Sequence, residues 1–517
     1  MNKLLFTLTL CLAASYQGAA QTFVHFTTTE ASAWSKTKAK LSTNVASDLS
    51  AEVSRTDESS SPLLQLTELQ PGHEFRAWGT CFNELDLDAL ELLTPADQQQ
   101  ILHDLFAPDG DLRFTRGRLT MNANDYSRAW YSCDTVSGDF ALNHFNIEHD
   151  RKNVIRLIHM AQRHQPNLTF WMSPWSPPTW MKINQDYPVL SSRFNHQPKE
   201  KDALLYAGAV VGSGAADIDP DEMKLLGDRN GVFPRRLATQ DYMIQDPRYL
   251  QAYANMFCRF IDLYRDEGIP IDMVMYQNEA YSYTPYPGCA WTAEGTIRFN
   301  RDYLRPTLQQ RHPEVKLYLG TFNTNRLDYV QKIVDGLKDD VLGLGIQWEC
   351  REHLDALRQR YPDLHLISSE SECGNGSMDW RAGEHTFHLL CDYIGRGCDE
   401  YFIWNFILCG NGQSPWGWRQ NALIQVDPET HKHRYTAEYY AVKHFSHYVT
   451  PGSRLLAYKS KDETQGMPLI AFVRPDGKRI IITANFTDNL RTASLKLGRR
   501  YLNLTLQPHS FNTYMEQ

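Results

Sequence analysis

The chain has 517 residues and a formal net charge of −9, with 42% hydrophobic and 22% charged residues. This ordinary globular mixture argues against a disordered or fibrous protein. The acidic balance, without a basic tract, argues against nucleic acid as a partner. The length suits a barrel of about 250–400 residues plus one accessory domain.

The amino-terminal residues have the pattern of an export signal. Lys3 precedes the apolar run LLFTLTLCLAA, and a short polar segment then ends in the small residues GAA at Ala20. A positive start, a short apolar segment and a small-residue cleavage site predict a signal peptide over residues 1–20. We therefore expect a secreted or periplasmic protein that begins at Gln21 after cleavage near Ala20. No later segment reaches about 18 apolar residues, so no transmembrane segment is expected.

Short apolar runs alternate with amphipathic stretches over residues 75–450. The amphipathic stretches have helical spacing, as at Val154 and Ile158, and Thr94-Pro95 predicts an N-cap with proline in the first helical turn. Eight runs alternating with eight helices predict an α/β fold, a (β/α)8 TIM barrel. An open doubly wound sheet is the alternative, but no glycine-rich phosphate loop follows the first run. The eight strand candidates are 75–80, 112–119, 168–173, 271–277, 316–321, 341–347, 363–370 and 400–406.

The two ends of the chain have a different pattern. Residues 21–74 are rich in Ser, Thr and charge, and we expect a loosely ordered lead-in with one strand, followed by a side-domain strand at LLQLTE (63–68). Residues 451–517 alternate apolar runs with turns such as PDG (475–477), which predicts antiparallel strands. The expected side domain is an antiparallel β-sandwich built from C-terminal strands and an N-terminal strand.

Acidic, amide and tryptophan side chains follow the predicted barrel strands. In a (β/α)8 barrel the carboxyl ends of the strands form the active site. Strand four ends in Gln277-Asn278-Glu279 and strand seven in Ser369-Glu370. Paired carboxyl groups suit glycoside cleavage, because one protonates the leaving oxygen while the other attacks the anomeric carbon, and tryptophan faces stack on sugars. Structural ion pairs are the alternative role for the two glutamates.

Longer motifs resemble glycoside hydrolase family 30, a clan A family of retaining β-glycosidases that includes glucosylceramidases and β-1,6-glucanases. They span nearly the whole barrel in the same order. HRYTAEYYAVKHFSHYVTPGS (433–453) also resembles the family's last barrel helix and the entry to its side domain. SPWSPPTWMK together with Asn-Glu at a strand end is the most specific combination. The matching runs are WGTCFNEL (78–85), ANDYS (123–127), SPWSPPTWMKIN (173–184), QNEAYSY (277–283), ISSESECGNG (367–376) and PWGWRQNALIQVD (415–427).

The resemblance implies roles for particular residues of this chain. Glu279 matches the acid/base, and Asn278 matches the amide that binds the sugar 2-hydroxyl. Glu370 matches the nucleophile, with Glu372 as its rival two residues further on. For the remaining residues other roles are possible: turn capping for Asp125, and core packing for Trp175 and Trp404. The other implied substrate-binding residues and cleft walls are Asp125, Trp175, Trp348, Trp404 and Asn421.

The activity implied is that of a secreted retaining β-glycosidase that needs no cofactor and no metal. A neutral β-glucoside is expected, since Arg118, Lys182 and Arg419 lie near strand ends but none is an obvious ligand for a uronate. We favour β-1,6-glucan or its oligosaccharides, with glucosylceramide as the alternative substrate. A non-catalytic carbohydrate-binding protein on the same scaffold is the alternative class. Insertions at 120–147 and 184–245 are expected on the catalytic face, and the oligomeric state stays open.

Overall fold

The computed structural model describes residues 22–44, 63–65, 72–205 and 238–517. The signal peptide predicted at residues 1–20 therefore lies outside the described residues, as does the central part of the 184–245 insertion. Within the described ranges, no helix has both the length and the apolar character that a membrane crossing requires.

Eight parallel strands close into a barrel in the order β10-β11-β4-β5-β6-β7-β8-β9, which confirms the predicted architecture. Each strand overlaps one of the eight predicted runs. Every residue of β4, β5 and β9 is buried, as expected for parallel strands with their outer faces covered by helices. The barrel strands are β4 (Ala77–Cys81), β5 (Arg116–Met121), β6 (Thr169–Pro174), β7 (Ile271–Met275), β8 (Lys316–Phe322), β9 (Gly343–Gln347), β10 (His365–Glu370) and β11 (Cys398–Ile403).

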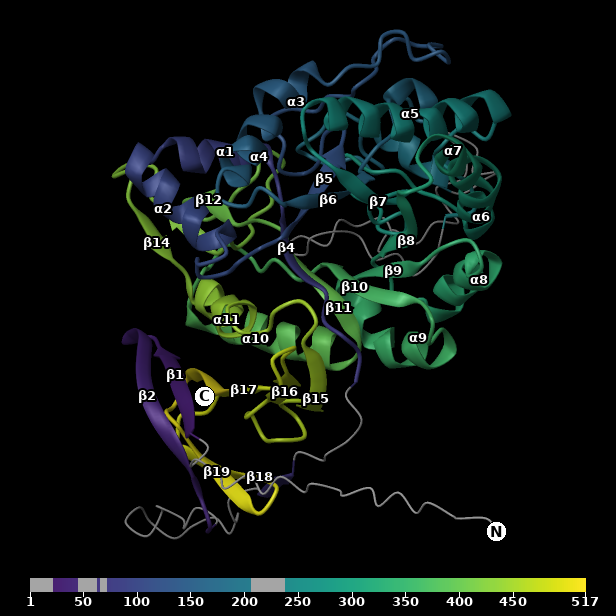
Figure 1. Ribbon diagram of the computed structural model, residues 1–517. Coiled ribbons are helices and arrows are strands. Elements are labelled where there is room, and N and C mark those ends of the chain that lie inside the picture. The colour runs from purple at the N-terminus through teal and green to yellow at the C-terminus, as the bar shows by residue number, and fades with distance from the viewer. Residues whose placement is uncertain (1–21, 45–62, 66–71, 206–237) are drawn as a thin grey trace, which may run out of the picture.

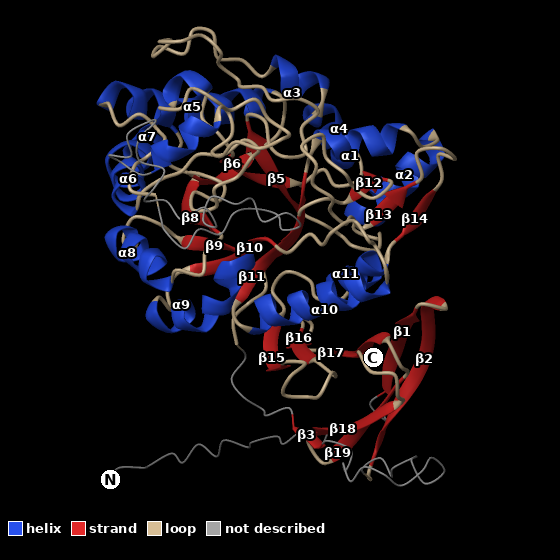
Figure 2. Ribbon diagram, turned by 180° about the vertical axis from the view of Figure 1, so that it is seen from behind, coloured by secondary structure: helices blue, strands red, loops and turns tan. Residues whose placement is uncertain are grey.

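Helices surround the barrel, and loops gather at its upper side in Figure 2. The predicted cap of one helix is confirmed, because Thr94 Oγ1 accepts a hydrogen bond from the Asp97 backbone N–H at 3.2 Å and Pro95 is the first helical residue. The α-helices are α1 (Glu84–Glu91), α2 (Pro95–Phe106), α3 (Glu148–Lys152), α4 (Val154–Gln162), α5 (Pro247–Asp266), α6 (Ala293–Phe299), α7 (Arg305–Arg311), α8 (Leu327–Leu337), α9 (Leu354–Arg360), α10 (Trp380–Gly395) and α11 (Ala437–Ser446). Short 3-10 turns lie at Thr179–Met181, Lys199–Leu205 and Trp348–His353, and a π-helical turn at Asn300–Leu304 joins α6 to α7.

A small three-stranded sheet follows the last barrel strand. Its strands are β12 (Ile407–Cys409), β13 (Ile424–Val426) and β14 (His433–Tyr435), in the order β12-β13-β14. The connection between β12 and β13 carries the PWGWRQN motif. Tyr126 Oη donates to the Gly412 carbonyl at 2.7 Å, so this connection contacts the loop that follows β5.

The side domain combines strands from both ends of the chain, in the order β15-β16-β17-β20-β1-β2-β19-β18-β3. Figure 1 accordingly shows the purple strands β1 and β2 beside the yellow strand β19. The neighbours pair antiparallel except β3, which pairs in parallel with β18 and confirms the strand expected near residue 63. The strands are β1 (Thr22–Thr29), β2 (Ser32–Ser42), β3 (Leu63–Gln65), β15 (Arg454–Lys459), β16 (Leu469–Val473), β17 (Arg479–Asn485), β18 (Arg491–Leu497), β19 (Arg500–Leu506) and β20 (Ser510–Glu516).

The lead-in holds one strand more than the sequence predicted. Phe23 and Phe26 of β1 are buried, and the strand lies in the middle of the sheet, paired with β20 and β2. The second strand, β2, exposes Lys36, Lys38 and Lys40 and carries few apolar side chains. Its pattern therefore lacks the apolar alternation by which a strand is recognised.

The side domain packs against the barrel through α10 and α11, which lie between the two domains in both views (Figures 1 and 2). Phe511 of β20 stacks on Trp380 and Phe387 of α10, with ring centroids 4.9 and 5.2 Å away. On the opposite face of the same strands, Ile481 packs with Leu495 of β18 in a separate apolar core. This core joins β17 to β18, which are separated in the strand order, so the sheet packs on itself as the predicted sandwich. Helix α10 follows barrel strand β10 in the chain and contacts this sheet.

Candidate active site

Glu279 and Glu370 lie at the carboxyl end of the barrel, Glu279 after β7 and Glu370 as the last residue of β10. Each is only 6% exposed. They are close enough that the charge of Glu370 raises the pKa of Glu279. The two glutamates that the sequence predicted as a pair therefore belong to one buried site.

Three donors surround the Glu370 carboxylate. Arg118 Nη1 lies 2.6 Å from Oε2, and Gln347 Nε2 donates to the same oxygen at 3.1 Å. Trp348 Nε1 donates to Oε1 at 3.3 Å. Burial raises the pKa of Glu370, whereas the guanidinium of Arg118 and the Trp348 hydrogen bond lower it. This carboxylate is held in one orientation next to a fully buried cation.

Glu279 lies in a different electrostatic environment. Burial, followed by the charge of Glu370, raises the pKa of Glu279 to about 8. Asn323 Nδ2 donates to Oε1 at 2.9 Å, while Oε2 is buried without a hydrogen-bond partner among the described residues. At neutral pH Glu279 is therefore a protonated acid with one oxygen free to donate, beside a second carboxyl that is paired with arginine.

The amide of Asn278 is fixed in one orientation. Its Oδ1 accepts from Arg118 Nη2 at 2.7 Å and from Thr321 Oγ1 at 2.9 Å. Because a guanidinium can only donate, the amide oxygen must face Arg118 and the Nδ2 group must face the other way. Among the described residues, none accepts a hydrogen bond from Nδ2, so this donor is available at the site.

Asp125, Trp175 and Trp404 join the same site. Burial, followed by the charge of Glu370, raises the pKa of Asp125 to about 8, and a hydrogen bond with the Trp175 side chain opposes the shift. The Trp175 and Trp404 rings stack with centroids 5.1 Å apart, and the Arg118 guanidinium carbon lies 4.5 Å from the Trp175 centroid. Both tryptophans are at most 2% exposed, so they also serve as core side chains around Arg118.

Two residues of the site have strained backbone conformations. Glu279 has a φ of 47° and Trp348 a φ of 35°, in the left-handed region that residues other than glycine rarely adopt. Such strain persists only where the surrounding structure imposes it, and it concentrates at functional sites. Here the strained residues follow the ends of β7 and β9, where the chain turns and a side chain enters the site.

Asn421 and Glu372 have partners outside this group. Asn421 Oδ1 accepts from the Gly376 backbone N–H at 2.7 Å, and its Nδ2 donates to Glu438 Oε1 at 3.2 Å. Glu372 pairs with Arg351 and His385. Although burial opposes the change, the contacts with His385 and Arg351 lower the pKa of Glu372. Glu372 is therefore engaged with Arg351 and His385 and not with Glu279.

Sequence reasoning missed several side chains of the site. Thr321 and Asn323 orient Asn278 and Glu279, and both lie at the end of β8, where polar residues directly follow an apolar run. Their position was the available signal, because the ends of β7, β9 and β10 also contribute polar groups to the site. Tyr286 gave no such signal. Burial, followed by the charges of the neighbouring carboxylates, raises its pKa, which places its ring beside them.

The described residues contain no group of three or more His, Cys, Asp or Glu side chains arranged to hold a metal ion. The site instead contains one carboxylate paired with arginine, one protonated carboxyl and several tryptophans, at the carboxyl end of a (β/α)8 barrel. This combination of groups is the one that glycoside cleavage requires. The fold and the site together indicate the class of glycoside hydrolases.

Comparison with known proteins gives the family within that class. The model of the glycosyl hydrolase family 30 TIM-barrel domain matches residues 75–201 and 240–449. The model of the family 30 beta sandwich domain matches residues 452–514. The chain belongs to glycosyl hydrolase family 30.

Two relatives and two solved structures show the extent of the similarity. The lysosomal acid glucosylceramidase of Mus musculus is 24% identical over 87% of this chain and 83% of its own length. The endo-1,6-beta-D-glucanase neg1 of Aspergillus fumigatus is 21% identical over 85% of this chain and 84% of its own length. The structure of SrfJ from Salmonella typhimurium has a TM-score of 0.75 at 21% identity and covers 96% of this chain and 99% of its own. The endo-beta1,6-glucanase BT3312 has a TM-score of 0.71 at 19% identity, covering 95% and 99%.

Proposed function

We propose that this family 30 enzyme is a retaining β-glucosidase in which Glu279 is the general acid/base and Glu370 the nucleophile. The difference in charge state between the two carboxyl groups carries the proposal. Arg118 favours the ionised form of Glu370, whereas burial and the charge of Glu370 keep the proton on Glu279. A retaining glycosidase needs this division of roles.

The reaction has two steps. In the first, the Glu279 proton passes to the glycosidic oxygen, the bond from C1 to that oxygen breaks, and the Glu370 carboxylate forms an ester with C1. In the second, Glu279, now ionised, takes a proton from water while the water oxygen attacks C1. The ester bond breaks, Glu370 leaves as a carboxylate, and two inversions at C1 give a product with the β configuration.

The cleaved sugar would be bound by the groups around the carboxyls. Asn278 Nδ2, free of other partners in the described residues, is the proposed donor to the 2-hydroxyl. Asp125 would bind further hydroxyls, and Trp175, Trp404 and Trp348 would form the walls of the site. We leave Asn421 out of this set because its side chain is bonded to Gly376 and Glu438.

A neutral sugar is the proposed substrate because the two buried basic side chains near the strand ends are already engaged, while the third, Arg419, is exposed on the connection between β12 and β13. Arg118 is fully buried and bonded to Glu370 and Asn278. Lys182 is also fully buried, and its Nζ donates to the carbonyls of Tyr187 and Gly288 at 2.7 Å each. Neither is available to bind the carboxylate of a uronate.

We propose β-1,6-glucan or its oligosaccharides as the substrate, with glucosylceramide as the second candidate. A lipid substrate would call for a continuous exposed apolar surface beside the site. In the described part of the chain the exposed large apolar residues are few and come from separate elements: Val136, Phe194, Leu342 and Leu490. The Aspergillus relative supports the glucan, and the mouse relative keeps the lipid as an alternative.

A panel of substrates tests this function. Purified enzyme is incubated with β-1,6-glucan, glucosylceramide in detergent micelles and glucuronoxylan, and the products are separated by chromatography. We expect glucose or gentio-oligosaccharides from the glucan and no cleavage of glucuronoxylan. Turnover of glucosylceramide far above that of the glucan would contradict the preferred substrate, and binding without any turnover would contradict the enzymatic roles.

We also propose export of the enzyme with removal of residues 1–20, on the evidence of the signal-like sequence. Amino-terminal sequencing of the protein secreted by an expressing cell tests the proposal. A first residue of Gln21 is the expected result, and retention of residues 1–20 would contradict it.

A further inference from the structure

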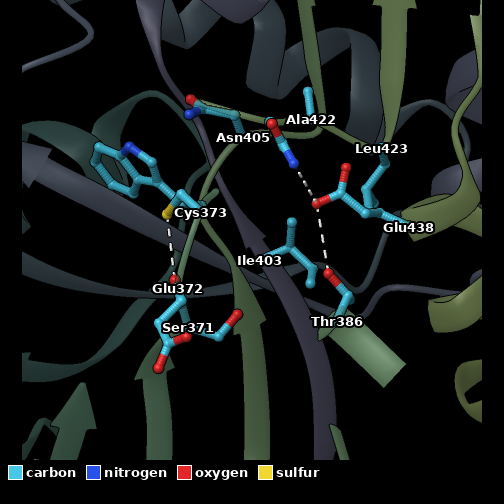
Figure 3. Close-up of a pocket in the computed structure, with 11 residues that line it drawn as sticks. Ser371, Glu372, Cys373, Thr386, Ile403, Asn405, Ala422, Leu423 and Glu438 are labelled. Carbon is cyan, nitrogen blue, oxygen red and sulfur yellow. Dashed lines mark hydrogen bonds between the residues drawn. The ribbon is translucent and has the colours of Figure 1, made fainter. Parts of the chain in front are cut away.

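A small cavity lies behind the nucleophile strand, between the segment that follows β10 and the helices α10 and α11 (Figure 3). Its volume is about 20 Å³, which is room for about one water molecule. The wall on the barrel side includes Ser371, Glu372 and Cys373, the residues directly after Glu370. On the opposite wall lies Glu438, whose carboxyl group points toward this segment in Figure 3.

Glu438 lies in the first turn of α11 and is 7% exposed. Its Oε1 accepts hydrogen bonds from Asn421 Nδ2 at 3.2 Å and from Thr386 Oγ1 at 3.4 Å. Its Oε2 is buried without a partner among the described residues. Burial raises the pKa of Glu438 to about 8, although the hydrogen bonds from Asn421 and Thr386 oppose the shift. The group is therefore a neutral carboxyl at neutral pH.

Asn421 connects Glu438 to the segment after the nucleophile. The backbone N–H of Asn421 donates to the Cys373 carbonyl at 2.6 Å. Its Oδ1 accepts from the backbone N–H groups of Gly376 and Met378 at 2.7 and 3.4 Å. These bonds hold the turn at residues 373–378, which begins three residues after Glu370. The Asn421 amide is thus held at Oδ1 by these two N–H groups and at Nδ2 by the acceptor that Glu438 supplies.

We propose that Glu438 is a positioning residue for the nucleophile and acts through Asn421. Arg118 and Trp348 hold the carboxylate end of Glu370, and the Glu438–Asn421 pair holds the main chain that follows it. Attack on C1 requires both, because a displacement of about 1 Å can cost about 100-fold in rate. This inference rests on the proposed role of Glu370 as nucleophile.

Labelling by an activated 2-fluoro glucoside isolates the attack of the Glu370 carboxylate on C1. The label forms an ester with Glu370, and its activated leaving group departs without help from the acid Glu279. The labelling rate therefore reports the position of Glu370 alone. Peptide mapping by mass spectrometry identifies the labelled residue, and the inhibition constant of a glucose-like competitive inhibitor reports sugar binding separately.

Two substitutions at one position separate the hydrogen bond from the shape of the side chain. Glu438→Gln keeps an acceptor for Asn421 and resembles the neutral acid, so we expect a labelling rate within about threefold of the wild type. Glu438→Leu removes the acceptor and should slow labelling by about 10- to 100-fold with little change in the inhibition constant. Thr386→Val is the matched control, because it removes only the other hydrogen bond to Glu438 and should label at the wild-type rate.

A double substitution tests the route through Asn421. Asn421→Ala should slow labelling as Glu438→Leu does, and the double variant should be no slower than Asn421→Ala alone. If Glu438→Leu does not fold, Asn421→Ala carries the same test. Wild-type labelling rates in both single variants, or a product of the two effects in the double variant, would overturn the inference. Failure of the wild type to label at Glu370 would instead overturn the proposed function.

Discussion

At Glu370 the Arg118 guanidinium lies 2.6 Å from one carboxylate oxygen, whereas no cation of the described ranges forms an ion pair with Glu279. Both side chains are equally buried, so the neighbours and not the exposure decide which carboxyl holds a proton. Asn278 accepts a hydrogen bond from the same Arg118. One arginine thus favours the ionised form of Glu370, the proposed nucleophile, and orients the amide of Asn278.

Replacing Arg118 tests its effect on the nucleophile. Arg118→Lys keeps a positive charge but loses the fork of donors that reaches both Glu370 and Asn278. The pKa of Glu370 should rise, so the acid limb of the kcat/KM profile should move to higher pH, with a loss of about 10- to 100-fold at the optimum. The matched control is Arg116→Lys, since Arg116 lies on the same strand and pairs with Asp272 and Glu400 instead. An unmoved acid limb in Arg118→Lys would contradict this role.

The pH dependence tests the acid. Activity on a substrate with a poor leaving group should fall as the pH rises through about 8, because Glu279 then loses the proton that the leaving oxygen needs. Glu279→Ala should lose this alkaline limb on a dinitrophenyl glucoside and should regain rate with azide, giving a β-glucosyl azide. Burial also raises the pKa values of Asp125 and Glu438 to about 8, so a limb that persists in Glu279→Ala would assign the titration to one of these two groups and not to Glu279.

The strand-end positions and the resemblance together predicted Glu279, Glu370 and Asn278 as site residues. In the structure Arg118 bonds to both Glu370 and Asn278, and the charge of Glu370 acts on Glu279. Asn323 was missed because the apolar run of β8 was taken to end before it. The partner of Asn421 could not be predicted, because Glu438 lies on a helix whose packing against the β10 segment has no local sequence signal.

The side chain of Lys182 joins the loop after β6 to the loop after β7, alongside bonds such as that from Asn195 Nδ2 to the Pro285 carbonyl. Its Nζ donates to Ser176 Oγ at 3.1 Å and to the carbonyls of Tyr187 and Gly288 at 2.7 Å. Tyr187 belongs to the first of these loops and Gly288 to the second, which also carries Glu279. The buried ammonium therefore fixes the two loops relative to each other.

Removal of this ammonium should destabilise the protein. Lys182→Met keeps the length of the side chain but leaves buried carbonyl groups without their donor, at a cost of about 2–4 kcal/mol in the free energy of unfolding. Denaturant unfolding measures the change. Lys332→Met is the control, because its ion pair with Glu294 is exposed and should contribute less than about 1 kcal/mol. Equal effects in the two variants would contradict the role of Lys182.

Among the elements, the barrel strands were predictable because each is an apolar run of the right length between helical stretches. The β1–β2 hairpin was not. Its pairing with β20 joins residues at opposite ends of the chain, such as Phe26 and Thr513, and no local pattern encodes that contact. The lysines of β2 also make the strand hard to predict, because they stand at alternate positions where apolar residues would be expected.

Over the whole molecule, the side domain and the catalytic barrel share the helices α10 and α11. Helix α10 follows the strand that ends in Glu370, and Phe387 in its middle stacks on Phe511 of the side sheet. Helix α11 carries Glu438 and also His444, which hydrogen-bonds to Thr513 of that sheet. The side domain therefore contacts the same two helices that lie against the segment after Glu370.

The stereochemistry of hydrolysis tests the central claim most directly. Proton NMR of the anomeric signals is recorded in the first minutes after the enzyme is added to a gentio-oligosaccharide, before the sugar equilibrates in water. A retaining enzyme with Glu370 as nucleophile releases the β anomer first, and the α anomer follows only by mutarotation. The α anomer as the first product would show a single inverting displacement and would contradict the roles proposed for Glu279 and Glu370.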